Sequence, residues 1–176
     1  AGLTDRLDDI VLIDGVDGRQ FTASTFIDQV KRLAGGLLAA GAVQGKTVAL
    51  IAPNSPEYCV IFHAVAWAGG TITTLNPTYT SNEIHHQLQD SGADLLITIP
   101  EILNTAQQGI ALLEGVQICV IGEVDGISSL SKFYGAPLEQ QVVIDLDRHS
   151  VVLPYSSGTT GLPKGVCLSH RNLVIM

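Results

Sequence analysis

Apolar, β-rich runs recur in this chain at intervals of about two dozen residues, and helix-like segments separate them. The runs begin near Thr47, Thr71, Asp94 and Val116. This alternation of strand and helix is typical of βαβ units, which form parallel sheets. The strands of such sheets are covered on both faces, in agreement with the nearly continuous apolar runs Val48–Ile51 and Leu95–Ile99. The sequence therefore predicts an α/β fold with an open, largely parallel sheet and flanking helices.

Three helices have recognisable start or stop signals. The first is predicted over Ser24 to Ala40, and Gly41 would end it. Its apolar face comprises Phe26, Val30, Leu33 and Leu37. A second helix is predicted to begin after Ser55, because an N-cap serine precedes a proline at the first helical position. A third begins after Thr80, which can form a capping box with Glu83.

The stretch from Tyr155 to Gly165 combines glycines, hydroxyls and one lysine between two apolar runs. Glycines let the backbone approach a ligand closely, so that successive N–H groups can face one anion. Hydroxyls add donors, and the lysine adds a mobile positive charge. The composition is typical of a loop that binds phosphate. The candidate residues are Ser156, Ser157, Gly158, Thr159, Thr160, Gly161 and Lys164.

This loop departs from the standard P-loop pattern. Counted from Gly158, Lys164 is in register. However, Pro163 stands where the second glycine belongs, and Gly165 where a magnesium-binding hydroxyl belongs. Short apolar runs at 151–153 and 166–168 predict a strand on each side, with no helix N-terminus facing the phosphate. On composition alone, an ordinary glycine-rich hairpin turn is an equally good interpretation.

The segment from Leu153 to Val166 resembles the signature loop of the adenylate-forming enzymes. This superfamily comprises acyl-CoA synthetases, luciferases and the adenylation domains of peptide synthetases. Upstream segments agree in order: Leu38–Gly41, Gly45–Leu50, Pro53–Glu57, Ala68–Gly70 and Leu75–Tyr79. The last of these and Leu153–Tyr155 resemble 4-coumarate-CoA ligases and their fatty-acyl relatives in particular. The resemblance extends from about Ile10 to the end of the chain.

The resemblance implies an ATP-dependent acid–thiol ligase that acts on an aryl or fatty acid. The carboxylate would attack the α-phosphate of Mg-ATP and release pyrophosphate, and the thiol of coenzyme A would then capture the acyl-adenylate. The implied cofactors and co-substrates are ATP, Mg²⁺ and coenzyme A. The seven loop residues would hold the phosphates, chiefly through the backbone from Ser157 to Gly161, with Thr159, Thr160 and Lys164 assisting.

Family members are several times longer, so the resemblance also implies an incomplete N-terminal portion of the AMP-binding domain that lacks activity by itself. Catalytic, adenine, acid-pocket and magnesium residues would lie downstream. The apolar run from Leu173 to Met176 has no cap or polar end, which independently suggests missing chain. Four parts are expected: 1–23, a β-hairpin lead-in pairing 10–13 with 20–22; 24–121, the βαβ sheet region; 122–149, a connection; and 150–176, the phosphate loop and following segment.

Three alternatives remain open at this point. The chain could belong to a nucleotide-binding regulatory module without ligase chemistry. It could belong to an adenylating enzyme with another acceptor, as in luciferases or in enzymes that charge carrier proteins. It could also be a plain α/β scaffold with a solvated turn.

Charge and cysteine usage exclude several other classes. Nine basic residues against seventeen acidic ones give a net charge of -8, which argues against a nucleic-acid partner. Cys59, Cys119 and Cys167 are odd in number and far apart, which indicates buried free thiols rather than a disulfide framework or a metal site.

The N-terminal segment lacks the basic start and apolar core of a signal peptide. The longest charge-free run has an apolar part that ends near Gly70, which is too short for a transmembrane helix. These absences and the free thiols predict a cytoplasmic protein. The resemblance to adenylate-forming enzymes implies that its partner is a small-molecule carboxylic acid.

Several polar residues favour a structural interpretation. His63 lies among apolar residues and is expected to be a core or interface histidine. The adjacent pair His85 and His86 points two ways around a helix, so surface positions are expected. Asp145 and Asp147 are expected on a solvated face. His170 and Asn172 are expected to start a helix.

Overall fold

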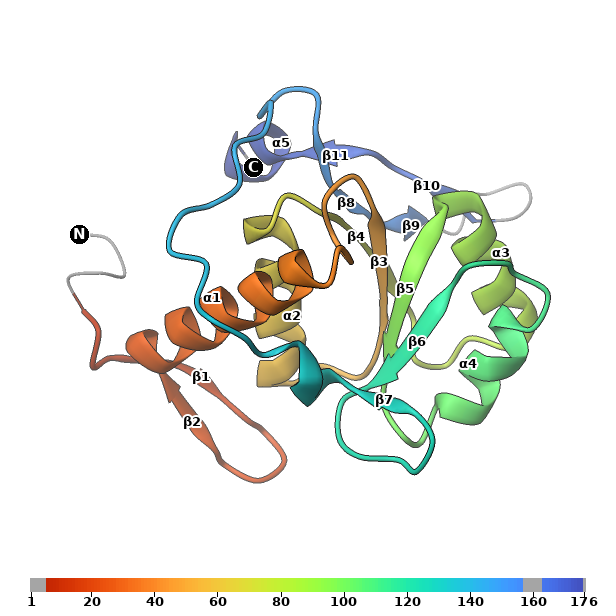
Figure 1. The fold of residues 1–176 in the computed structure, drawn as a ribbon, viewed down its shortest axis with the longest axis horizontal. Helices are drawn as coiled ribbons and strands as arrows, with labels where there is room; N and C mark the ends of the chain where they lie inside the picture. The colour runs from red at the N-terminus through yellow and green to blue at the C-terminus, as the bar shows by residue number, and fades with distance from the viewer. Residues whose placement is uncertain (1–5, 157–162, 176) are drawn as a thin grey trace.

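The computed structural model describes residues 6–156 and 163–175, which form a sheet with helices on both faces (Figure 1). The strands are β1 (Ile10–Ile13), β2 (Gln20–Thr22), β3 (Thr47–Ile51), β4 (Thr71–Leu75), β5 (Ala93–Thr98), β6 (Gln117–Val120), β7 (Ser128–Ser129), β8 (Ser150–Leu153), β9 (Tyr155–Ser156), β10 (Lys164–Gly165) and β11 (Leu168–Ser169). The helices are α1 (Ala23–Ala39), α2 (Pro56–Trp67), α3 (Ser81–Ser91), α4 (Leu103–Ile110), the 3₁₀ helix η2 (Leu130–Phe133) and α5 (His170–Ile175).

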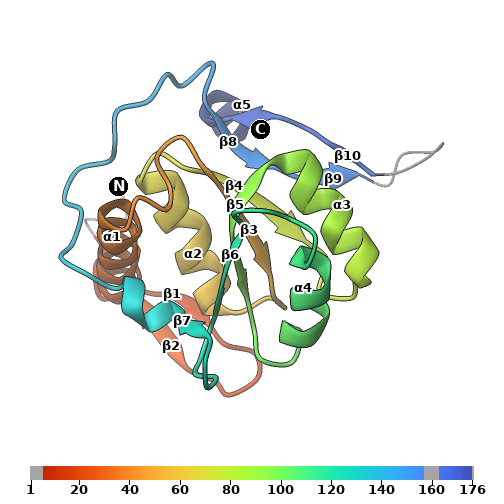
Figure 2. The same cartoon turned by 45° about the vertical axis from the view of Figure 1, so that its right-hand side comes forward.

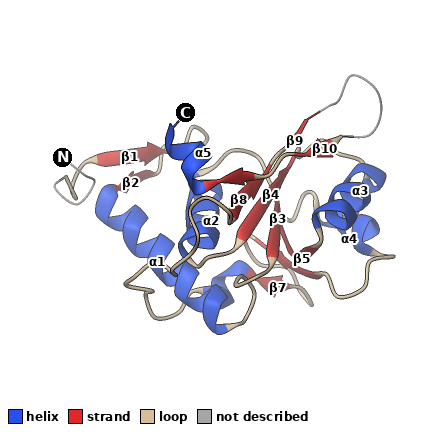
Figure 3. Ribbon diagram, turned by 90° about the horizontal axis from the view of Figure 1, so that it is seen from above, coloured by secondary structure: helices blue, strands red, loops and turns tan. Residues whose placement is uncertain are grey.

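Within the described residues, seven strands form the main sheet in the order β11-β8-β4-β3-β5-β6-β7. All neighbouring pairs are parallel except β11 and β8. The chain adds β4 on one side of β3 and then β5 on the other, so successive crossovers pass over opposite faces. Helices α1 and α2 accordingly cover one face, and α3 and α4 the other (Figures 2 and 3). The predicted α/β fold with a largely parallel sheet is confirmed.

Strand β3 lies at the centre and contributes to a core on each face. Val48 and Leu50 pack with the residues of α1 and α2. Ala49 and Ile51 alternate with them and pack with the residues of α3 and α4. Because β3 is buried on both faces from Val48 to Ile51, these four residues are all apolar rather than alternating.

The predicted helix signals are confirmed. Ser55 caps α2 by accepting a hydrogen bond from the Tyr58 amide at 3.2 Å, and Pro56 follows it. Thr80 and Glu83 form the complete capping box of α3. Helix α1 begins one residue earlier than predicted, and Gly41 follows its end with a positive φ of 64°.

The segment between β6 and β8 crosses over α1. Its strand β7 pairs with β6, and the Leu138 amide donates to the Lys31 carbonyl of α1 at 2.9 Å. A Cβ atom at Gly36 would overlap the carbonyl oxygen of Phe133, so this crossing requires glycine. The Trp67 indole donates to the Leu138 carbonyl at 2.8 Å. These contacts guide the chain to the position where β8 joins the sheet beside β4.

Candidate functional site

The predicted phosphate loop follows the carboxyl end of β8. This strand is parallel to β4, with Ile72 opposite Val152 and Thr73 opposite Leu153. In open α/β sheets, ligands bind beyond the carboxyl ends of the strands. The sheet therefore places the loop at an edge where a ligand can reach it.

Two short strands form the arms of the loop. Lys164 of β10 pairs with Ser156 of β9, and both residues are exposed. The structure thus brings together two of the predicted site residues from opposite sides of the loop. The remaining five, Ser157, Gly158, Thr159, Thr160 and Gly161, lie outside the described residues. The predicted strands on either side of the loop are present, although the second, β11, is limited to Leu168–Ser169.

Gly165 allows the two arms to approach each other. It pairs with Tyr155, and a Cβ atom at Gly165 would lie 3.0 Å from the Tyr155 ring. The Val166 amide then donates to the Pro154 carbonyl at 2.9 Å. The tyrosine ring therefore lies across the second arm, and a larger residue at Gly165 would displace it.

Helix α3 contacts both arms. The Tyr155 hydroxyl donates to Oδ2 of Asp90 at 2.6 Å, and Nε2 of His86 lies 3.3 Å from the Pro163 carbonyl oxygen. Burial raises the pKa of the Tyr155 phenol above its ordinary value, and the bond to the Asp90 carboxylate raises it further. The phenol therefore remains a protonated donor at neutral pH.

A cavity of about 460 Å³ opens between α3 and the second arm of the loop. Its walls are formed by His86, Asp90, Pro163, Lys164 and Gly165. An exposed lysine that borders an open cavity can meet an anionic ligand such as a phosphate chain. The carboxylate of Asp90 lines the same cavity, and nothing in the sequence pattern indicated that it would.

A buried relay connects α3 to the strand that leads into the loop. The Gln87 side-chain amide donates to the Thr73 hydroxyl at 2.8 Å, and this hydroxyl donates to the Leu153 carbonyl at 2.8 Å. Gln87 is only 2% exposed. Sequence reasoning missed this residue, because a lone glutamine in a polar helix gives no signal of burial.

His85 and His86 are half-buried rather than surface residues, contrary to expectation. Nδ1 of His85 lies 3.0 Å from the Gly109 carbonyl oxygen of α4, whereas His86 contacts the loop. The two rings thus face different elements. The expectation was wrong because α3 is covered on one side by α4 and on another by the loop arms, and neither contact is visible from local sequence.

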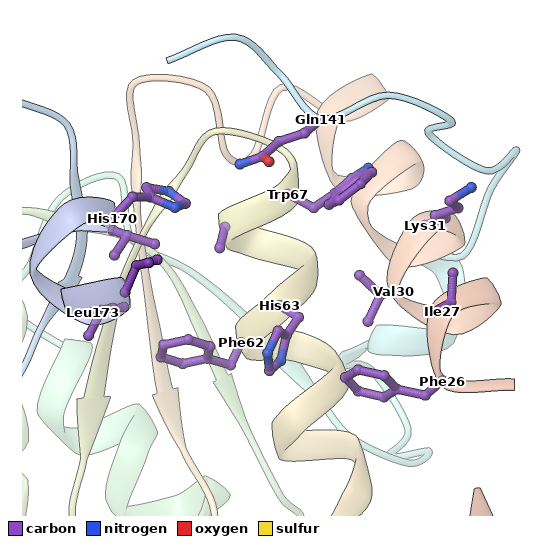
Figure 4. Close-up of a pocket in the computed structure, with 13 residues that line it drawn as sticks. Phe26, Ile27, Val30, Lys31, Phe62, His63, Trp67, Gln141, His170 and Leu173 are labelled. Carbon is purple, nitrogen blue, oxygen red and sulfur yellow. The ribbon is translucent and has the colours of Figure 1, made fainter. Parts of the chain in front are cut away.

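A second, apolar pocket of about 410 Å³ lies among α1, α2 and α5 (Figure 4). Its lining includes Phe26, Phe62, Trp67 and Leu173. His63 is exposed at this pocket rather than in the core, because its face of α2 points into the gap between α1 and α5. Its ring packs edge-on against Phe26 at a centroid distance of 5.3 Å, and its Nδ1 lies 2.8 Å from the Cys59 carbonyl oxygen.

Other sequence expectations had mixed outcomes. Cys119 is buried, but Cys59 is half-buried and Cys167 is exposed, because Cys167 lies at the outer edge between β10 and β11. Asp145 and Asp147 are exposed, as predicted. Asn172 accepts a hydrogen bond from the Ser169 amide at 2.9 Å at the start of α5, which confirms its role at a helix start, and His170 is the first residue of α5.

Within residues 6–156 and 163–175, no helix is long and apolar enough to cross a bilayer. These ranges also contain no group of three His, Cys, Asp or Glu side chains that could hold a metal ion.

Comparison with known proteins gives a consistent result. The model of a family described as AMP-binding enzyme matches residues 3–176. The chain is 40% identical over 177 residues to 4-coumarate-CoA ligase 5 of Oryza sativa subsp. japonica, covering 98% of this chain and 32% of the relative. The chain thus spans about a third of the length of that curated relative.

Solved structures are similar over nearly the whole chain. The luciferase-like enzyme of the mealworm Zophobas morio matches with a TM-score of 0.89 and 25% identity, covering 96% of this chain and 41% of that one. An anthranilate CoA ligase solved with anthranoyl-AMP matches with a TM-score of 0.86 and 25% identity. The match covers 95% of this chain and 33% of that one.

Proposed function

Because this chain belongs to the family of AMP-binding enzymes, we propose that it is part of a ligase that activates a carboxylic acid with ATP and transfers the acyl group to coenzyme A. The observation that carries the proposal is the pairing of Lys164 with Ser156 at the arms of the loop, beside an open cavity at the carboxyl end of β8.

In the proposed first step, a carboxylate oxygen forms a bond to the α-phosphorus of ATP. The bond from that phosphorus to the bridging oxygen breaks, and pyrophosphate leaves. The thiol of coenzyme A then attacks the acyl carbon, loses its proton and displaces AMP. Charge is the main obstacle to the first step, because an anion must approach a polyanion.

In this proposal Lys164 neutralises charge on the pyrophosphate as it leaves, and the Ser156 hydroxyl donates to a phosphate oxygen. The loop backbone between them, Ser157 to Gly161, supplies further N–H donors. Mg²⁺ would enter with ATP and offset the charge of its phosphates. No Mg²⁺ ligand is assigned to the described residues, since they contain no suitable group of side chains.

An aryl acid is the first candidate substrate, because the chain is similar to ligases that are named for two aryl acids, 4-coumarate and anthranilate. A fatty acid is the second. Similarity to the luciferase-like enzyme favours one further candidate function, adenylation with a different acceptor. The cytoplasmic location and the four-part division of the chain also remain proposals.

The test is pyrophosphate release by the full-length parent with ATP, Mg²⁺ and a panel of aryl and fatty acids. We expect release that depends on a particular acid and falls at least about tenfold in Lys164→Ala, as for the loss of one charge-stabilising group. Lys46→Ala is the matched control, because Lys46 is also exposed but precedes β3 at the opposite end of the strands. If ATP binds and no acid triggers release, a regulatory nucleotide-binding module becomes the better interpretation.

A further inference from the structure

Two residues of α3, His86 and Asp90, contact the two arms of the loop. They are four positions apart and therefore lie on the same face of the helix. Asp90 accepts a hydrogen bond from Tyr155 of the first arm at 2.6 Å, and His86 contacts Pro163 at the start of the second arm at 3.3 Å. One rigid element thus contacts both ends of the loop.

The contact between Tyr155 and Asp90 is the stronger of the two. A hydroxyl that donates to a carboxylate at 2.6 Å forms a charge-assisted hydrogen bond, which is stronger than a bond between neutral groups. The same tyrosine ring lies against Gly165 of the second arm. This one side chain of β9 thus contacts both α3 and β10.

Asp90 occupies an unfavourable place for a ligand contact. It lines the cavity together with Lys164, where the phosphates of ATP are proposed to enter. A carboxylate there repels phosphate, so it does not serve to attract the nucleotide. Within the described ranges, no ion pair joins Asp90 to Lys164, whereas Oδ2 of Asp90 accepts the Tyr155 hydroxyl. The geometry therefore favours a structural role for this carboxylate, as the hydrogen-bond acceptor that holds Tyr155.

We infer that Asp90 and Tyr155 are positioning residues, which hold β9 and β10 against α3 so that Lys164, paired with Ser156, faces the cavity before ATP binds. Pre-ordering of the arms reduces the conformational entropy lost on binding. The inference rests on the proposed function, because it takes ATP as the ligand of this cavity. The inference assigns to α3 a role in ATP binding, because its Asp90 holds the arms of the loop in place.

Three variants of the full-length parent separate the hydrogen bond from the charge. Tyr155→Phe removes the hydroxyl and keeps the ring against Gly165. Asp90→Ala removes the acceptor, and Asp90→Asn keeps an acceptor oxygen without the negative charge. We expect Tyr155→Phe and Asp90→Ala each to raise the KM for ATP about fivefold, the size expected for one partly exposed charge-assisted hydrogen bond.

The KM for the acid should stay unchanged in both variants, and Asp90→Asn should remain within about twofold of the wild type because its amide oxygen still accepts the hydroxyl. The double variant Tyr155→Phe with Asp90→Ala should be no worse than either single variant, because both remove the same bond. Equal effects of Asp90→Asn and Asp90→Ala would contradict the inference and indicate that the charge itself matters.

A second measurement does not depend on activity. Trypsin cleaves after Lys164 only when β10 is released, and cleavage after the exposed Arg148 of the preceding connection serves as an internal reference. In the parent without ATP, Tyr155→Phe and Asp90→Ala should raise cleavage after Lys164 about fivefold relative to Arg148. A parallel rise at both sites would indicate general destabilisation and would overturn the positioning role.

The two measurements distinguish failure of the inference from failure of the proposed function. A wild-type parent that releases no pyrophosphate with any acid overturns the proposed function, while the cleavage ratio still reports whether α3 restrains the loop. An active wild type with unchanged KM for ATP and unchanged cleavage in Tyr155→Phe overturns the inference alone.

Discussion

At the scale of single residues, Gly36 shows how one missing side chain sets the path of the backbone. The connection before β8 passes so close to α1 that a Cβ atom at Gly36 would overlap the Phe133 carbonyl oxygen. Because backbone must move to relieve this overlap, we expect Gly36→Ala to destabilise the fold by about 3 kcal/mol. Urea denaturation measures the change. Gly15→Ala is the control, since a Cβ there meets nothing within 4 Å, and equal stability of the two variants would contradict the close approach.

The cysteines differ in reactivity because of burial. Burial raises the pKa of the Cys119 thiol to about 12 from its ordinary 9.0. Between pH 9 and about 12, the folded state therefore keeps the thiol proton of Cys119, whereas the unfolded state loses it. The contribution to stability is complete below pH 9 and is lost as the pH rises from there through about 12.

At pH 8 we expect iodoacetamide to modify the exposed Cys167 in the folded protein and Cys119 only after denaturant is added. Mass spectrometry of the alkylated peptides checks this. Equal rates at the two cysteines in native buffer would show that Cys119 is not buried as described.

At the scale of elements, the order of α3 depends on its capping box. Thr80 accepts the amide of Glu83, and the Glu83 carboxylate accepts the amide of Thr80 at 2.7 Å. Loss of an N-cap hydroxyl typically destabilises a helix by about 1 kcal/mol, so we expect Thr80→Ala to lower the thermal midpoint of unfolding. Circular dichroism measures it. Ser81→Ala, one residue further into the helix, should have a much smaller effect, and equal shifts would argue against the cap.

The elements that sequence predicted are those with a strong local signal. Strand β3 is apolar from Val48 to Ile51, and α2 begins at Pro56 directly after its N-cap Ser55, so both were placed correctly. The strands β7, β9 and β10 were missed because two residues carry no periodicity, and their pairing depends on distant chain. The exposure of Cys167 was also missed, because this residue lies between the short strands β10 and β11, whose pairing the local sequence does not show.

At the scale of the whole molecule, the candidate site combines segments that are far apart in sequence. Loop composition and family resemblance predicted Ser156 and Lys164 as candidate site residues, and the structure pairs the two. Asp90 lies 65 positions before its partner Tyr155, and only the tertiary fold brings α3 and β9 together. A single sequence contains no local pattern for such a contact. The candidate loop residues could therefore be proposed from the sequence, whereas the contact between Tyr155 and Asp90 of α3 could not.

The 176-residue chain is expected to be inactive by itself. Its curated relative is about three times as long, and Lys164 is the only cation among the seven candidate loop residues. Because the adenine, acid and magnesium contacts are proposed to lie downstream, we expect ATP to bind no tighter than about 1 mM, roughly -4 kcal/mol. Titration calorimetry measures the affinity, and a pyrophosphate assay with the acid panel measures turnover, with the parent protein as the positive control. Acyl-adenylate formed by the isolated chain would show that these 176 residues already contain the catalytic groups.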